Sequence, residues 1–377
     1  MRRSHVLVAA LAAGSFALAG PVAGPAQAAA GPVGGPLLGT TRVVVTPGAT
    51  PLPKVGAAAW MVSDATTGTV LAAKDPHGRL MPASTLKMLT ALTVLPLLNK
   101  TSQYIARDQD TTIEGTRVGM VSGAAYTIDD LFYGLFLASG NDAASALANA
   151  AGGWAATVRG MNVEARALQA DDTHAVNPSG LDAKEQCSSV YDLTLFARAG
   201  LALPAFRAYA STRLYNFPGV KPPKARGPRP WFQIQNGNRL LMQGYPGMVG
   251  VKTGYTTLAG RTYVGAALRG GHLIVVALMK VAGPSDVAAR KLLDWGFANV
   301  GKAGVGQLVP PGGASPPPST PAPSPVAAGV GSAVASGSLR LPAAMFVTAA
   351  ALALVLLVLV GAGSARRRRQ ERRRGAR

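Results

Sequence analysis

Three short strings in this 377-residue chain combine hydroxyl and amine side chains that suit acyl transfer. They are, in sequence order, Ser84-Thr85-Leu86-Lys87, Ser139-Gly140-Asn141 and Lys252-Thr253-Gly254. A serine hydroxyl is a weak nucleophile until a base takes its proton. None of the strings contains a histidine, so a lysine is the candidate for that base. Each string is common by itself, but the three together indicate an enzyme that opens an amide bond at its carbonyl carbon.

The first string carries the predicted nucleophile and base. Ser84 and Lys87 are three residues apart, which places both side chains on one face of a helix. A lysine works as a base only when it is neutral, and burial or a nearby positive charge lowers its pKa toward that state. The residues that follow are mainly apolar, so we expect a buried helix, and Lys252 would supply the charge. We therefore predict Ser84 as the nucleophile and Lys87 as its base.

The second string is predicted to serve proton transfer and positioning. The Ser139 hydroxyl would relay a proton between a lysine and the leaving amine. The Asn141 amide would bind a substrate backbone group or hold Lys87 in place. On its own, this string is equally typical of a helix cap.

The third string is expected to lie on a strand that binds substrate. Lys252 and the Thr253 hydroxyl would hold a terminal carboxylate. Gly254 leaves room for an extended substrate to join the strand edge through main-chain hydrogen bonds. The Tyr255 N–H would join that of Ser84 in an oxyanion hole. Taken alone, this string is also compatible with a turn that carries an exposed lysine.

The elements that must position these strings follow from the apolar patterns around them. Two hairpins and four helices are predicted: strands 57–63 and 69–73, strands 262–268 and 272–280, and helices 84–98, 127–137, 143–151 and 284–299. Strands near both ends of this region, with helices between them, indicate an antiparallel sheet with a helical insert. The predicted fold class is an α/β sandwich, in which helices flank the sheet and an inserted helical lobe completes it.

Both ends of the chain indicate export and membrane attachment. Arg2, Arg3, an apolar stretch and Ala26-Gln27-Ala28 form the parts of a secretory signal. Residues 341–364 carry no charge and precede eight arginines, which is typical of a transmembrane helix with a cytoplasmic flank. The expected organisation is a signal peptide at 1–28, a leader at 29–56, a catalytic domain at 57–300, a Pro/Ala/Gly-rich disordered stalk at 301–340, one transmembrane helix at 341–364 and a basic cytoplasmic tail at 365–377. The catalytic domain would then lie outside the cell.

Composition narrows the choice of partners and cofactors. The net charge of +20 would suit nucleic acid, but the densest basic run lies beside the predicted span, so no nucleic-acid partner is expected. The single cysteine, Cys187, cannot form a disulfide within the chain. The four histidines are not at metal-ligand spacing, so no metal or other cofactor is expected.

The three strings together resemble the motifs of serine-type D-alanyl-D-alanine carboxypeptidases, the low-molecular-mass penicillin-binding proteins of the β-lactamase/transpeptidase-like family. Three further strings are similar to segments of that family: Asn177-Pro178-Ser179-Gly180-Leu181-Asp182, Asn236-Gly237-Asn238-Arg239-Leu240-Leu241 and Thr256-Thr257-Leu258-Ala259-Gly260. The resemblance covers about residues 57–300. Many members carry a small β-rich domain after the catalytic one and anchor by an amphipathic helix. In this chain the predicted stalk takes the place of the β-rich domain, and the predicted transmembrane helix takes the place of the amphipathic helix.

The resemblance implies that Ser84 attacks the carbonyl between the last two D-alanines of a peptidoglycan stem pentapeptide and forms an acyl-enzyme. Lys87 would be the base for acylation and hydrolysis, and Ser139 the third catalytic residue. The implied substrate-binding residues are Asn141, Lys252, Thr253, Gly254 and Tyr255. β-Lactams would inhibit the enzyme by acylating Ser84. The implied location is the cell membrane, with the catalytic domain facing the cell wall.

Three alternatives share this site. A class A β-lactamase needs a glutamate for deacylation, and the only glutamates between the second and third strings, Glu164 and Glu185, stand in the wrong context. A DD-endopeptidase or transpeptidase would use the same residues on cross-linking peptides. A non-catalytic wall-binding scaffold would lack a motif residue, and none is missing.

Overall fold

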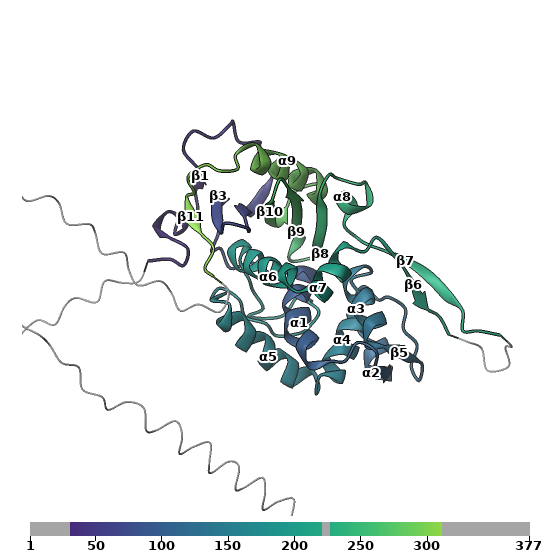
Figure 1. Ribbon diagram of the computed structural model, residues 1–377. Coiled ribbons are helices and arrows are strands. Elements are labelled where there is room, and N and C mark those ends of the chain that lie inside the picture. Colours follow the sequence, from purple (N-terminus) through teal and green to yellow (C-terminus); the bar gives the residue numbers. More distant parts are fainter. Residues whose placement is uncertain (1–30, 221–226, 311–377) are drawn as a thin grey trace, which may run out of the picture. The chain divides into compact units, whose positions relative to one another are not determined.

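The computed structural model describes residues 31–220 and 227–310 (Figure 1). The predicted signal peptide at 1–28, transmembrane helix at 341–364 and basic tail at 365–377 lie outside these residues, as does most of the stalk. Among the described residues, no helix is both long and apolar enough to cross a bilayer.

An antiparallel sheet of seven strands forms the centre of the fold (Figure 1). Its order is β1-β3-β2-β10-β9-β8, and β11 pairs with β3 beside this path. The strands are β1 Val43–Val45, β2 Ala57–Asp64, β3 Thr69–Lys74, β8 Met248–Thr256, β9 Gly260–Arg269, β10 His272–Val281 and β11 Gly306–Gln307. The hairpins β2–β3 and β9–β10 confirm the two that the sequence predicts.

Helices cover both faces of this sheet. The helix α9 (Ser285–Ala298) packs with the apolar residues of one face, and α6 (Val190–Ala202) packs with those of the other. The remaining helices are α1 Lys87–Val94, α2 Asp108–Thr111, α3 Ile128–Phe136, α4 Asn141–Ala150, α5 Trp154–Ala167, α7 Pro204–Ser211 and α8 Arg239–Met242, with the 3-10 turns η1 Pro36–Leu38, η2 Ala83–Leu86 and η3 Leu95–Leu97. Most of them lie between β3 and β8 in sequence. The predicted α/β fold with a helical insert is therefore confirmed.

Two small hairpins complete the described fold. One joins β4 (Gln103–Ile105) to β5 (Ala125–Thr127), and the other joins β6 (Leu214–Pro218) to β7 (Trp231–Gln235). The second extends from the lobe as an arm (Figure 1). Neither hairpin is predicted from the sequence. The strands β4 and β5 have only three residues each, and the apolar pattern of β6 and β7 is broken by polar residues and by Pro218.

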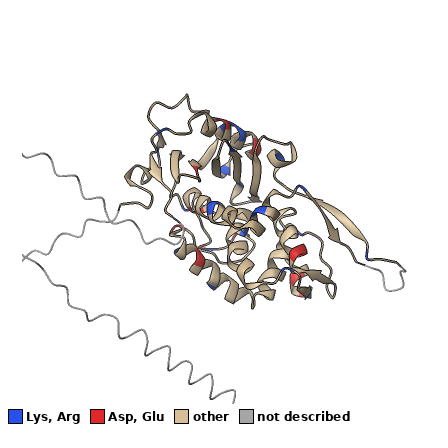
Figure 2. Ribbon diagram, in the orientation of Figure 1, with Lys and Arg blue, Asp and Glu red and all other residues tan. Residues whose placement is uncertain are grey.

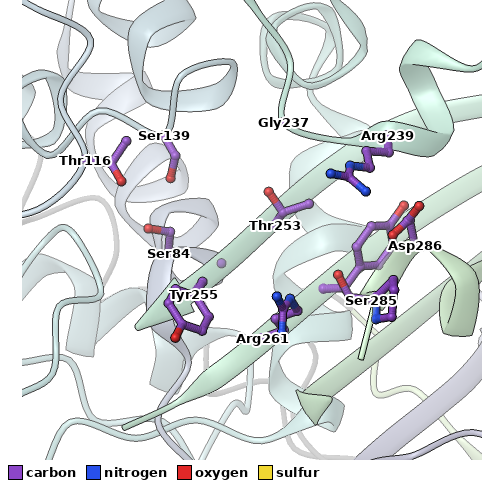
Figure 3. Close-up of a pocket in the computed structure, with 13 residues that line it drawn as sticks. Ser84, Thr116, Ser139, Gly237, Arg239, Thr253, Tyr255, Arg261, Ser285 and Asp286 are labelled. Carbon is purple, nitrogen blue, oxygen red and sulfur yellow. The ribbon is translucent and has the colours of Figure 1, made fainter. Parts of the chain in front are cut away.

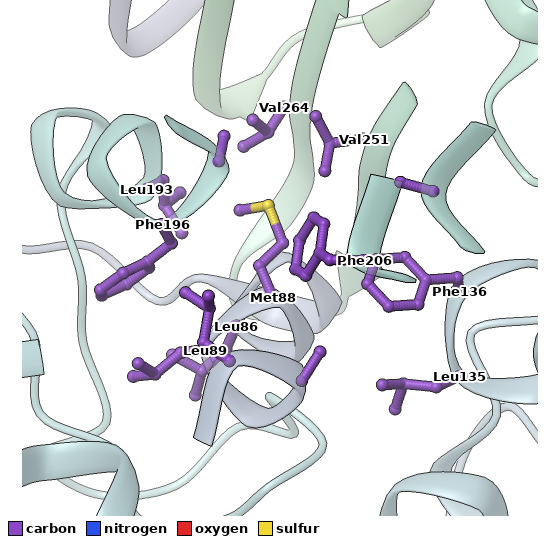
Figure 4. Packing of buried hydrophobic residues seen from close by; sticks show 14 of the residues in the cluster. Leu86, Met88, Leu89, Leu135, Phe136, Leu193, Phe196, Phe206, Val251 and Val264 are labelled. Carbon is purple, nitrogen blue, oxygen red and sulfur yellow. The ribbon is translucent and has the colours of Figure 1, made fainter. Parts of the chain in front are cut away.

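The larger apolar cluster lies where the lobe meets the sheet. Figure 4 shows Met88 of α1 beside Phe206 of α7 and below the strand residues Val251 and Val264, all of them buried. Packing on every side of α1 encloses Lys87, its first residue, which is fully buried. The apolar sequence after Ser84 thus creates the dry surroundings that a neutral lysine needs.

The sequence predicts one helix at 84–98, but the structure has three separate elements there: η2, α1 and η3. Ser84 lies in the 3-10 turn η2, Lys87 begins α1, and α1 ends at Val94. Pro96 then falls in η3, since proline has no N–H to continue an α-helix. The two side chains still meet, because residues three apart eclipse one another in a 3-10 turn.

The domain extends beyond the predicted boundaries of 57 and 300. Part of the predicted leader, β1, pairs with β3, and Leu38 of the same segment is fully buried. Part of the predicted stalk, β11, pairs with the same strand, and β1 and β11 bond to its opposite ends. Both cover an edge that would otherwise present unpaired N–H and C=O groups. Such short edge segments are too brief to give a strand pattern in the sequence.

Candidate active site

A cleft of about 390 Å³ opens beside β8 and extends from Ser84 and Ser139 to the start of α9 (Figure 3). The strand β8 is the last of the sheet path, so the edge away from β9 is unpaired by that sheet. The residues that line the cleft are Ser84, Thr116, Ser139, Gly237, Arg239, Thr253, Gly254, Tyr255, Arg261, Tyr263, Pro284, Ser285 and Asp286.

Ser84 and Lys87 are in direct contact. Lys87 Nζ lies 2.9 Å from Ser84 Oγ, 2.7 Å from Asn141 Oδ1 and 2.7 Å from the Ser179 carbonyl oxygen. A neutral amine has two N–H donors and one lone pair, so it can donate to the two carbonyl oxygens and accept from the hydroxyl. Burial, and then the charge of Lys252, hold the pKa of Lys87 well below its ordinary value. The contacts and the pKa both favour Lys87 as a base.

The turn at 177–182 places one of these partners. Asn177 Oδ1 accepts hydrogen bonds from the backbone N–H groups of Ser179, Gly180 and Leu181. Gly180 has φ +81°, and a methyl group there would collide with the Ala83 carbonyl. The turn therefore packs closely under η2 and directs the Ser179 carbonyl at Lys87.

The second string joins the first through Asn141. Its Oδ1 accepts from Lys87, and its Nδ2 donates to the Glu114 carbonyl at 2.7 Å. The neighbouring Asp142 carboxylate accepts from the N–H groups of Val118, Gly119 and Met120 at 2.8–3.1 Å. Asp142 thereby fixes the loop that carries Thr116 against the start of α4.

Lys252 joins the second string to the third. It is 2% exposed, and its Nζ donates to Ser139 Oγ at 2.9 Å and to the Thr253 carbonyl at 2.8 Å. Burial lowers the pKa of Lys252 to about 7. Ser139 has φ +57°, a left-handed conformation that costs a serine free energy. Ser139 adopts this conformation where it lines the cleft.

Gly254 allows β8 to approach the nucleophile. A methyl group at Gly254 would lie 2.8 Å from the Ser84 nitrogen and 3.0 Å from the Thr85 nitrogen, and it would collide with Thr262 Oγ1. The Ser84 N–H is therefore next to the backbone of residues 254–255, where the oxyanion hole is predicted. Thr253 lines the cleft, and Tyr255 stands at its mouth with the Arg261 guanidinium 5.6 Å from its ring centroid.

The structure brings all eight predicted site residues together. Five of them line the cleft: Ser84, Ser139, Thr253, Gly254 and Tyr255. Lys87, Asn141 and Lys252 lie directly behind them, joined by the hydrogen bonds given above. Within the described part of the chain, no group of three or more His, Cys, Asp or Glu residues could hold a metal ion.

Two cationic residues of the cleft are not predicted from the sequence. In Figure 3, Arg239 lies beside Thr253 and next to Asp286, and Arg261 lies near Tyr255. Arg239 stands within a string that was singled out, but nothing in the sequence directs its side chain to the cleft. Arg261 follows the turn after β8, and the β8–β9 pairing sets it opposite Tyr255.

Comparisons with known proteins identify the family of this chain. The family model for D-alanyl-D-alanine carboxypeptidase matches residues 46–282. The chain is 41% identical to D-alanyl-D-alanine carboxypeptidase DacB2 of Mycobacterium tuberculosis over 275 residues, which are 69% of this chain and 89% of that protein. It is 32% identical to DacD of Salmonella typhimurium over 66% of this chain, and spans 64% of the length of that relative.

Solved structures give the same result. A crystal structure of D-alanyl-D-alanine carboxypeptidase from Mycobacterium tuberculosis matches with a TM-score of 0.64 and 41% identity, over 70% of this chain and all of that one. The Streptomyces K15 DD-transpeptidase matches with a TM-score of 0.61 and 28% identity, over 66% of this chain and all of that one. With the family model covering more than half of its length, the chain belongs to the D-alanyl-D-alanine carboxypeptidase family of serine peptidases.

Proposed function

We propose that this D-alanyl-D-alanine carboxypeptidase removes the terminal D-alanine of peptidoglycan stem pentapeptides through an acyl-enzyme on Ser84. The observation that carries the proposal is the buried Lys87 amine, 2.9 Å from the Ser84 hydroxyl with its other two contacts on carbonyl oxygens. The chemistry follows the family to which the chain belongs.

Acylation begins with transfer of the Ser84 hydroxyl proton to the neutral Lys87 amine. Ser84 Oγ then bonds to the carbonyl carbon of the penultimate D-alanine, and the carbonyl oxygen becomes an oxyanion. The N–H groups of Ser84 and Tyr255 stabilise that charge, and each such donor typically contributes about 3 kcal/mol. The close approach at Gly254 supports this pairing of donors.

Collapse of the oxyanion breaks the C–N bond and releases D-alanine. The leaving amine takes a proton from the Ser139 hydroxyl, which is replenished from Lys252 at 2.9 Å. Proton exchange with solvent then returns both lysines to their starting states, so that Lys87 loses the proton it took from Ser84 and Lys252 regains one. Water attacks the ester with the neutral Lys87 as the base again. Attack by Ser84 Oγ on a β-lactam carbonyl, with Lys87 again as the base, gives an acyl-enzyme whose amine leaving group stays attached, which makes penicillin an inhibitor.

A terminal carboxylate would bind where the cleft is cationic. The Thr253 hydroxyl, Arg239 and Arg261 line that part of the cleft, and the buried Lys252 amine lies directly behind it. Arginine donors suit a carboxylate because their N–H groups form a planar fork. A requirement for a free carboxylate at this position suits an enzyme that acts on the ends of stem peptides.

The test is D-alanine release by the purified chain from a peptide that ends in D-Ala-D-Ala, with Ser84→Ala as the inactive control. Cleavage confined to cross-linked dimers would make the enzyme an endopeptidase, and transfer to an added amine would make it a transpeptidase, as the K15 relative is named. Rapid turnover of penicillin would make it a β-lactamase. Labelled penicillin that never becomes covalently bound would contradict any acyl-enzyme.

We also propose that the chain is a single-pass membrane protein whose catalytic domain faces the cell wall. The support is the sequence: a secretory signal at 1–28, and an uncharged run at 341–364 before eight arginines. Protease added to intact spheroplasts should remove the penicillin-labelled domain and leave a short membrane-bound fragment. Recovery of the labelled domain in the cytosolic fraction would contradict this location.

A further inference from the structure

The β6–β7 hairpin has two different faces, because side chains alternate along its strands. The inner face is aromatic and packs on the lobe. The rings of Phe217 and Tyr126 stack with centroids 5.4 Å apart, and those of Tyr215 and Tyr133 stack at 3.9 Å. The Tyr215 hydroxyl also donates to Asp130 Oδ1 at 2.6 Å. These contacts fix the hairpin on the lobe, so its opposite face has a defined shape.

The outer face of the hairpin is polar apart from its ends. It consists of three cross-strand pairs: Leu214 with Gln235, Asn216 with Gln233, and Pro218 with Trp231. All of these side chains except Pro218 are exposed, and Trp231 is 62% exposed. Within residues 31–220 and 227–310, the three amide side chains form no side-chain hydrogen bond. Three amides and one indole ring are thus available to a ligand.

The chemistry of this face selects an uncharged ligand. Amide side chains offer donors and acceptors together, and an indole ring offers a flat apolar surface with one N–H. The strands β6 and β7 carry no charged residue (Figure 2), although the chain has a net charge of +20. A chain of N-acetylated amino sugars has hydroxyl and acetamido groups for the amides and ring faces for the indole.

The hairpin is continuous with the catalytic cleft. The strand β7 ends at Gln235, and two residues later Gly237 lines the cleft, followed by Arg239. A polymer on the outer face would therefore lie along the strand that leads into the cleft.

We propose that the outer face of the β6–β7 hairpin binds the glycan chain from which the stem peptides branch. The proposal rests on the proposed function, because it assigns a site to the carrier of that peptide. The Trp231 indole stacks on one sugar ring, and Asn216, Gln233 and Gln235 bind hydroxyl and acetamido groups. The face then retains the enzyme on the polymer between successive cleavages.

The test uses soluble β-1,4-linked N-acetylglucosamine oligomers, which are neutral and carry no peptide. The purified full chain should bind them, and Trp231→Ala should weaken binding at least about tenfold. The double variant Gln233→Ala/Gln235→Ala should also weaken it. The matched control is Leu97→Ala, since Leu97 is 65% exposed on η3, away from the hairpin. Release of D-alanine from a short free peptide should be the same in all four proteins.

Tryptophan fluorescence gives an independent measure. The chain has four tryptophans, of which Trp60 and Trp295 are buried. The oligomers should quench the emission of the wild type and of Trp154→Phe, and should leave that of Trp231→Phe unchanged.

Several results would overturn the inference. They are the absence of oligomer binding, an equal loss in Leu97→Ala, or a parallel loss of short-peptide activity in Trp231→Ala, which would indicate a structural role. Trp231-dependent binding to anionic phospholipid vesicles without oligomer binding would assign the face to the membrane, since Lys221, Lys224 and Arg226 stand in the intervening sequence. Oligomer binding without D-alanine release would uphold this inference and refute the carboxypeptidase function alone.

Discussion

Two buried lysines dominate the site at the scale of single residues. Lys87 contacts two carbonyl oxygens and the Ser84 hydroxyl, which suits a neutral amine. Lys252 contacts the Ser139 hydroxyl and one carbonyl oxygen. In the described part of the chain, neither forms an ion pair. The charge of Lys252 lowers the pKa of Lys87, so the two amines divide the work of binding an anion and accepting a proton.

Removal of the Lys87 amine should strongly slow acylation of Ser84 without unfolding the protein. We expect Lys87→Ala to slow covalent labelling by penicillin about 10³-fold, in line with the usual contribution of a general base. The rate is measured by mass spectrometry of the Ser84 adduct. Lys291→Ala, which removes an exposed lysine from α9, should label at the wild-type rate. Rapid labelling of Lys87→Ala would mean that another group is the base.

Activity should fall on the alkaline side as Lys252 loses its proton. The pKa of Lys252 is lowered by burial to about 7, so the group is cationic below that pH and neutral above it. The kcat/KM for a peptide with a free terminal carboxylate should therefore decline as pH rises through about 7. The same peptide with a terminal amide should show a smaller decline, because it presents no anion to Lys252 and depends on its proton only for the relay through Ser139. Identical alkaline limbs for the two peptides would exclude carboxylate binding by Lys252.

The residues predicted to carry out the reaction could be found from the sequence, whereas the arginines that line the cleft could not. Ser84, Lys87 and Lys252 stand in strings whose chemistry is local. Arg239 and Arg261 reach the cleft only because β8, β9 and the segment after β7 meet there. Contacts between distant segments leave no pattern in a single sequence, and arginine is also frequent on plain surfaces.

At the scale of elements, the site depends on the distance between β8 and η2. Gly254→Ala should push β8 away from Ser84, because the new methyl group would lie 2.8 Å from the Ser84 nitrogen. We expect penicillin labelling to fall by about 10²-fold or more, as for the loss of an oxyanion donor. Circular dichroism should show a folded protein. Gly56→Ala is the control, since its nearest contact would be an ordinary 3.5 Å. Normal labelling of Gly254→Ala would show that the approach is not needed.

Helices and strands with long alternating or apolar sequences were predicted correctly, and those with short ones were not. The strands β2, β3, β9 and β10 and the helices α3, α4 and α9 lie within two residues or so of their predicted ends. The helix at 84–98 was wrong as one element, since Pro96 forces η3 and Ser84 sits in η2. The hairpin β6–β7 gains its order from stacking on Tyr126 and Tyr133, which lie far away in sequence.

At the scale of the whole molecule, the fold is closed by segments outside the predicted domain. A chain that begins at residue 57 loses β1 and the buried Leu38, together with the bond from Gln307 N to the Gly34 carbonyl at 2.8 Å. Compared with a chain that begins at residue 31, its free energy of unfolding should be lower by at least about 2 kcal/mol, the usual value for burying one leucine. Urea unfolding measures this difference. Equal stabilities would mean that the segment only rests on the fold.

Penicillin labelling separates this effect from damage to the site. Since β8 lies at the opposite edge of the sheet from β1, the shortened chain should label at the normal rate without urea.

The pairing of both β1 and β11 with β3 also determines where a fusion tag can be attached. Both ends of the described chain leave the sheet at one margin, and five strand spacings, roughly 24 Å, separate that margin from β8. A biotin tag or a fluorescent protein fused beyond either end would therefore point away from incoming peptide. Such a fusion, immobilised on a sensor chip, should still capture antibiotic from solution, which would make the protein a practical probe for β-lactam screening.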